Sequence, residues 1–135
     1  MLNSKRLIIV IRFSLLVAVM SLGRPATAIA QDEVQVLIEK MQKSTGRAKA
    51  DLLNQVSVTF RNTDRLKSLE YARLAYKASS ELNYTAGQAL ALKNEGICWF
   101  FIGNNDSATY CYKEALAGFM RIRDMKGISA CYNNL

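Results

Sequence analysis

Apolar residues recur along most of the chain at intervals of three and four, which is the spacing of one face of an α-helix. The spacing predicts a helix over residues 88–102, a break at residues 103–105, and a second helix that runs to about Ile122. Glycine and asparagine at the break tolerate a left-handed backbone, and Asp106 or Ser107 can cap the helix that follows. A strand over residues 97–102 is the alternative on composition, but both flanks keep the helical period.

Two earlier breaks carry residue types that begin helices. Residues 62–64, Asn-Thr-Asp, separate two amphipathic segments, and Asp64 can accept a backbone hydrogen bond at a helix N-cap. Residues 85–88, Thr-Ala-Gly-Gln, have the form of a capping box. Further upstream, an initial helix is predicted from four apolar residues at helical spacing: Val34, Leu37, Ile38 and Met41.

The pattern returns after 40 residues. A shift of that length aligns residues 87–96 with residues 127–135, glycine on glycine, and places Leu52 on Leu92 and then on Tyr132. It also aligns two sets of mostly small side chains, Ser68, Ala72 and Ala75 with Ala108, Tyr112 and Ala115. Periods of about 20–50 residues are typical of repeat architectures. The sequence therefore predicts an all-α fold made of repeated pairs of antiparallel helices.

These repeated positions resemble the tetratricopeptide repeat family. In residues 87–126 the positions that characterise the family fall on Leu92, Gly96, Trp99, Ala108, Tyr112 and Ala115. Glu95 stands where the family usually has leucine, and residues 47–86 match well only at Leu52 and at the small residues. The resemblance implies antiparallel helical hairpins stacked as a right-handed superhelix, an alpha solenoid.

The repeat register divides the chain into five predicted segments. They are a signal peptide over residues 1–30, an initial capping helix and linker over 31–46, a degenerate repeat over 47–86, a second repeat over 87–126, and the truncated start of a third over 127–135. A helical stack needs a terminal helix with a polar outer face. Because the third repeat stops at Leu135, we expect the chain to be a piece of a longer protein.

The aromatic tract of residues 98–101 is either a ligand site or the interior of a helix pair. Gly96 and Ala108 permit two helices to approach closely, and Trp99 and Tyr112 can fill the space around that contact. We therefore predict that residues 96–103 lie mostly in the core and bind no cofactor. Leu52, Leu92 and Ala115 complete the set of predicted structural residues.

The resemblance also implies a concave surface that is lined by the first helix of each hairpin and binds a peptide or a partner helix. Carried over by position, the lining residues are Leu53, Asn54, Ser57, Arg61, Lys93, Asn94, Ile97, Phe101, Asn133 and Asn134. An asparagine at the same position of each unit can hydrogen-bond a peptide backbone. The lysine-and-asparagine clamp of some family members is incomplete here, so no such activity is predicted. An exposed polar helix face is the alternative interpretation of each residue.

Residues 1–30 have the pattern of a secretory signal. Lys5 and Arg6 precede an apolar stretch over residues 7–22, and Ala28-Ile29-Ala30 offers small side chains to a signal peptidase. An uncleaved membrane anchor is the alternative, although Arg12 would be costly within a span. Without this segment the net charge falls from +7 to +3, with 14 basic and 11 acidic residues interspersed. That distribution argues against a nucleic-acid binder, whose basic residues cluster.

Cysteine and histidine usage gives little support for catalysis or metal binding. Cys98, Cys111 and Cys131 have no Cys-x-x-Cys spacing, and the sequence contains no histidine. An exported protein could pair two of these cysteines. Their other interpretation, as small apolar residues in helix interfaces, fits the pattern better. Asp106 and Glu114, two acids that follow the aromatic tract, fit a helix cap and a surface position. We predict no catalytic residue and no metal site.

Two functions remain open from the sequence. The first is an exported, non-catalytic scaffold of the periplasm or cell envelope that binds a protein partner. The second is suggested by the signal, the degenerate early repeat and the 40-residue period, which look like the N-terminal sensor region of a bacterial membrane-bound signalling protein. The output of such a protein would be a histidine kinase or a helix-turn-helix domain. The coding sequence downstream of Leu135 would distinguish the two.

Overall fold

The computed structural model describes residues 26–135, with side chains from residue 31 onward. Throughout this range the regular elements are α-helices and there is no strand, which confirms the predicted all-α class. The predicted signal sequence lies outside the described residues up to residue 25. The helices of the described range are α2 (Ala26–Gln42), α3 (Gly46–Phe60), α4 (Arg65–Glu81), α5 (Thr85–Ile102), α6 (Asn105–Arg121) and α7 (Met125–Asn134).

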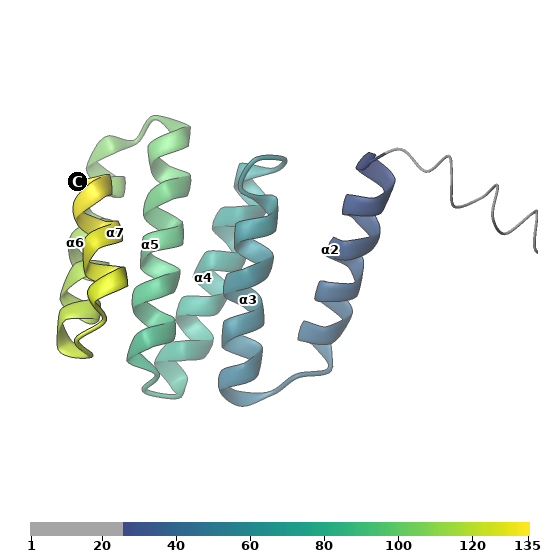
Figure 1. The fold of residues 1–135 in the computed structure, drawn as a ribbon, viewed down its shortest axis with the longest axis horizontal. Helices are drawn as coiled ribbons and strands as arrows, with labels where there is room; N and C mark the ends of the chain where they lie inside the picture. Colours follow the sequence, from purple (N-terminus) through teal and green to yellow (C-terminus); the bar gives the residue numbers. More distant parts are fainter. Residues whose placement is uncertain (1–25) are drawn as a thin grey trace, which may run out of the picture. The chain divides into compact units, whose positions relative to one another are not determined.

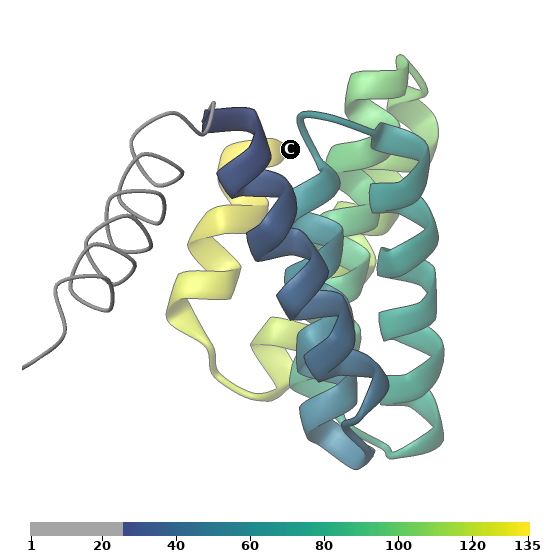
Figure 2. The same cartoon turned by 90° about the vertical axis from the view of Figure 1, so that its right-hand side faces the viewer.

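The chain divides into two compact units, residues 1–35 and residues 36–135. The described part of the first unit is the beginning of α2. In the second unit, α3 to α7 alternate in direction and are joined by short turns (Figures 1 and 2). Each helix packs on the next, and α5 also contacts α3 and α7. This packing of adjacent helices is consistent with a helical repeat.

Two turns of the second unit have the same backbone geometry 40 residues apart. Tyr84 N donates to Ser79 O at 2.8 Å, and Asp124 N donates to Phe119 O at 3.0 Å. Asn83 and Arg123 adopt positive φ angles of 50° and 57° at equivalent points of these turns. After each turn a glycine, Gly87 or Gly127, lies against residue 79 or 119 of the preceding helix. Both glycines lie in the first turn of the next helix, where a Cβ would collide with that neighbour.

The positive φ of Arg123 gives a stability prediction. A left-handed backbone conformation destabilises a residue with a Cβ by about 1–2 kcal/mol. Glycine avoids this cost, but part of the stabilisation is lost because glycine raises the conformational entropy of the unfolded chain. Arg123→Gly should therefore raise the free energy of unfolding by about 0.5–1 kcal/mol, measured by urea denaturation. The matched change at Arg121, the last residue of α6, should lower it, because that residue has no positive φ. A destabilised Arg123→Gly protein would contradict the interpretation.

One predicted helix N-cap is confirmed by the structure and two are wrong. Asp64 caps α4 as predicted, since its side chain accepts from Lys67 N at 3.0 Å. The cap of α6 is Asn104, which accepts from Ser107 N, so the assignment to Asp106 or Ser107 is wrong. The capping box predicted at residues 85–88 is also wrong: α5 begins at Thr85, and its N-cap Tyr84 makes no side-chain capping bond. Gly87, the third residue of that predicted box, packs against Ser79 of α4.

The core of the second unit consists of two clusters on either side of α5. One contains Met41, Leu52, Leu53, Ala75 and Ala91, with Leu37 and Ile38 of α2 packed against it. The other contains Ala89, Ala115, Phe119 and Cys131. The apolar residues predicted to form an initial helix thus contribute to this core at Leu37, Ile38 and Met41. Because α5 touches helices on two sides, it is apolar over most of its circumference.

Candidate functional site

The hairpin of α5 and α6 closes around Gly96. A Cβ placed on Gly96 would lie 2.7 Å from Tyr112 Cε1 and 3.2 Å from the Ala108 carbonyl oxygen. Ala108, Tyr112 and Ala115 are buried, as is Leu52 in α3. Leu92 and Trp99 are only partly buried. The close approach predicted between residues 96 and 108 is therefore present, and it holds α5 in a fixed position against α6.

The aromatic tract is less buried than the sequence predicts. Cys98 is buried and Trp99 partly so, but the exposed fractions of Phe100, Phe101 and Ile102 are 56%, 48% and 42%. The prediction that residues 96–103 lie mostly in the core is wrong for their second half. The physical reason is the turn of about 100° per residue, which points consecutive helical side chains in different directions. Trp99 lies under the Arg73 guanidinium, 5.3 Å from the ring centroid, and donates to Glu95 Oε1 at 3.2 Å.

One stripe of α5 carries three of the six predicted binding residues that remain accessible, Lys93, Ile97 and Phe101. It runs along a single helical face through Ala86, Leu90, Lys93, Ile97 and Phe101, and we call it the α5 stripe. The first four side chains are partly exposed and Phe101 is exposed. Buried residues flank it on both sides: Asn94 and Cys98 on one, Ala89 and Gly96 on the other. The stripe is therefore an edge of α5 that neighbouring helices cover only in part, and Leu90 also packs against the cluster of Ala89 and Phe119.

A groove of about 270 Å³ lies at the N-terminal end of the α5 stripe. Its walls come from α3, α5, the end of α6 and the start of α7, and its lining residues are Asp51, Tyr84, Ala86, Leu90, Lys93, Phe119, Asp124, Lys126 and Gly127. Apolar side chains form part of this lining, together with two acidic residues and two lysines. We call it the α5 groove. It can hold a short apolar segment and pair with charges of either sign beside it.

Two arginines lie toward the other end of the α5 stripe. The Arg65 guanidinium lies 5.2 Å from the centroid of the Phe101 ring. Arg61 is partly buried, its Nη2 donates to Asn94 Oδ1 at 3.2 Å, and its buried Nε has no hydrogen-bond partner among the described residues. This end of the stripe therefore combines an exposed aromatic ring with positive charge, a combination that suits stacking and cation–π contacts.

Four of the predicted lining residues are in the interior. Leu53, Asn54, Ser57 and Asn94 are buried, so the prediction that they line an exposed concave surface is wrong. Asn94 Nδ2 donates to Asn54 Oδ1 at 3.2 Å, and Asn54 Nδ2 donates to the Gly87 carbonyl oxygen at 3.2 Å. Ser57 and Ser68 each donate a hydroxyl to the other's carbonyl oxygen. These side chains join α3 to α4 and α5, while Asn133 and Asn134 of α7 are exposed.

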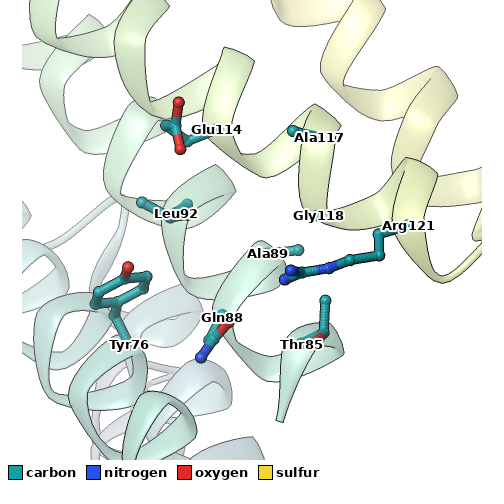
Figure 3. Close-up of a pocket in the computed structure, with 9 residues that line it drawn as sticks. All are labelled: Tyr76, Thr85, Gln88, Ala89, Leu92, Glu114, Ala117, Gly118 and Arg121. Atoms are coloured by element: carbon teal, nitrogen blue, oxygen red, sulfur yellow. The ribbon is translucent and has the colours of Figure 1, made fainter. Parts of the chain in front are cut away.

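A second hollow of about 350 Å³, which was not predicted from the sequence, lies between α4, α5 and α6. Figure 3 shows Arg121 extending over Ala89 toward Gln88 and Thr85, with Glu114 at the other end beside Leu92. Small residues leave the space open, since Ala117 and Gly118 line it from α6. A Cβ on Gly118 would lie 2.9 Å from Ala89 Cβ. The run of small residues on α6 was the available signal.

The three cysteines are buried and unpaired. Burial raises the pKa of the Cys98 and Cys131 thiols, and it raises the pKa of Cys111 to about 11. All three are therefore protonated at neutral pH, and Cys98 Sγ donates to Ser68 Oγ at 3.1 Å. Their interpretation as small residues in helix interfaces is confirmed. Within residues 31–135 no three cysteine or acidic side chains gather in a group that could hold a metal ion.

Two further observations complete the description of the site. Among the helices that the structure describes, none has both the length and the apolar character required to span a bilayer. Compared with known proteins, the chain matches no family model, no curated sequence and no solved structure.

Proposed function

We propose that this chain is a tetratricopeptide-type helical repeat protein that binds a protein partner without catalysis, through the α5 stripe and the α5 groove. The single observation that carries the proposal is the open stripe itself. Leu90 and Ile97 are partly exposed and Phe101 is exposed, so apolar surface remains accessible along one edge of α5 between its buried faces. Exposed apolar surface rimmed by polar groups is typical of a protein-binding site.

Equivalent contacts 40 residues apart support the repeat part of the proposal. Asn54 and Asn94 hold the same position in the two units and are hydrogen-bonded to each other. The turns that precede α5 and α7 share their backbone hydrogen bonds and their residue with a positive φ. Such agreement is expected where one supersecondary unit is stacked on a copy of itself, because each unit buries its apolar face against the next.

The dimensions and charges of the stripe favour a peptide or a single helix as the partner. From residue 86 to residue 101 the stripe is about 22 Å long, at about 1.5 Å per residue. Amphipathic helices dock in such grooves with anchors at intervals of three and four residues. Leu90 and Ile97 supply apolar contact, Lys93 a positive charge between them, and Phe101 a ring beside Arg65. An amphipathic partner with acidic residues beside its apolar anchors would complement this arrangement.

A binding role fits the chemistry of the site better than a catalytic one. The cysteine thiols are protonated in helix interfaces, and the acidic residues of the α5 groove, Asp51 and Asp124, alternate with lysines at its edge. Residues 1–30 support export to the periplasm or cell envelope as part of the same proposal. The partner would then be another protein of that compartment.

The proposal predicts site-specific crosslinking. The full chain carrying photoreactive benzoylphenylalanine at Ile97 should give one discrete product of higher mass when it is irradiated in an extract of its own cell envelope. An excess of unlabelled chain should compete that product away. The matched control places the same group at Lys113, which is exposed on α6 and lines neither hollow. Equal products from both positions, or none from position 97, would contradict the proposal.

A further inference from the structure

The outer side of α4 carries an exposed apolar and charged face that the proposed function does not use. Ser68, Ala72, Ala75 and Ser79 form the buried side of this helix. On the opposite side the exposed fractions of Leu66 and Leu74 are 72% and 42%, with charged residues between them. Six residues line a shallow hollow of about 450 Å³ there: the exposed Leu66, Glu70, Arg73, Leu74 and Lys77, and the buried Leu69 at its edge. We call them the α4 outer face.

The order of residues on this face is self-complementary when two copies run in opposite directions. If the midpoint between residues 71 and 72 lies on a two-fold axis, Glu70 of each copy faces Arg73 of the other. The same axis sets Leu66 against the aliphatic stem of Lys77. A two-fold interface requires one patch to complement itself in this way. A parallel arrangement would instead set Glu70 against Glu70.

The charges of the face are available for such pairing. Glu70 forms no ion pair or hydrogen bond within the described chain, and its side chain is exposed. Arg73 uses Nε to bind Glu95 Oε1 at 2.9 Å, and its side chain is 57% exposed. A guanidinium has five N–H donors, so the others remain for an acceptor outside the chain. Arg73 is also held in place over Trp99, which limits the entropy lost on pairing.

We infer that the α4 outer face binds a second copy of this chain in an antiparallel, two-fold dimer. Stable interfaces usually bury about 800 Å² on each partner, and one face of a 17-residue helix offers less than that. The dimer is therefore weak and reversible, and it forms at high local concentration. The α5 stripe lies on a different helix, so each copy keeps its proposed partner site free.

Charge reversal tests the pairing directly. In sedimentation velocity at protein concentrations from micromolar to about millimolar, the full chain should show a reversible dimer. Glu70→Arg or Arg73→Glu alone should raise the dissociation constant about tenfold or more, because each sets like charges opposite each other twice. An equimolar mixture of the two variants should dimerise again, since the introduced arginine of one chain then faces the introduced glutamate of the other. Circular dichroism checks that each variant stays folded.

The control for net charge is Lys113→Glu, an exposed change on α6 that should leave the dimer unaffected. A full chain that stays monomeric over the whole range overturns the inference. So does a dimer that Glu70→Arg leaves unchanged, or a mixture of variants that fails to recover.

Cysteine crosslinking tests the direction of the helices. Leu66→Cys and Lys77→Cys chains, mixed and oxidised mildly, should form a mixed disulfide and little of either symmetric one. The native thiols are buried and protonated, so they do not compete. Symmetric disulfides alone would overturn the antiparallel arrangement. Crosslinking at Ile97 is independent of this experiment, so the failure of either proposal can be recognised separately.

Discussion

The substitution Gly96→Leu should abolish cooperative folding of the second unit. A single Cβ at residue 96 already lies 2.7 Å from the ring of buried Tyr112 and 3.2 Å from the Ala108 carbonyl oxygen. A leucine side chain adds three more carbons to a space that holds none, and it would force α5 and α6 apart. We expect a loss of at least about 4 kcal/mol, beyond the usual range of point substitutions. Far-UV circular dichroism during urea denaturation measures it.

Two matched variants show whether the loss comes from the close contact of the helices. Gly96→Ala should cost about 1–3 kcal/mol, because the Tyr112 ring must shift and the Ala108 carbonyl oxygen must give way slightly. Lys93→Ala, less than one helical turn away on the α5 stripe, should change stability by no more than about 0.5 kcal/mol. If Lys93→Ala unfolded the protein and Gly96→Leu did not, the assignment of buried and open faces on α5 would be wrong.

Features with a local physical cause were predictable from the sequence. The helical period, the breaks near residues 62–64 and 103–105, and the Asp64 cap depend on neighbouring residues alone. The structure has each of them, although the second break is one residue shorter than predicted because α6 begins at Asn105. The contact of Gly96 with α6 was also predictable, because small residues at fixed positions on two consecutive helices permit a close approach. In each case the residue type itself carries the constraint.

Features that depend on a third helix were not predictable in this way. Asn94 was expected on a partner-binding surface because the family resemblance places a lining residue there, yet it lies where α5 meets α3 and is satisfied by Asn54. Phe100 was expected inside with the rest of the aromatic tract, yet 56% of it is exposed. Phe101 was predicted both in that tract and among the lining residues, and at 48% exposed it agrees with the second prediction. Their burial depends on how far each helix covers its neighbour.

Removing the side-chain amide of Asn94 should cost about 2–4 kcal/mol of unfolding free energy. Asn94 Nδ2 donates to Asn54 Oδ1, and Asn94 Oδ1 accepts from Arg61 Nη2, both at 3.2 Å. In Asn94→Ala the Asn54 oxygen stays buried without a donor. Arg61 loses its acceptor as well, while its Nε is already without one. A buried polar group left unpaired costs more than a hydrogen bond contributes, and urea denaturation of the full chain measures the loss.

A double-mutant cycle separates the paired amides from simple loss of volume. If the two asparagines act as a pair, Asn54→Ala and Asn94→Ala together should cost less than the sum of the single changes by about 1 kcal/mol. The reason is that the second change removes a group that the first left unpaired. The exposed Asn134, at the equivalent position of α7, is the matched control, and Asn134→Ala should have little effect. Strict additivity of the two buried changes, or an equal loss at Asn134, would show that the hydrogen bond between α3 and α5 does not stabilise the stack.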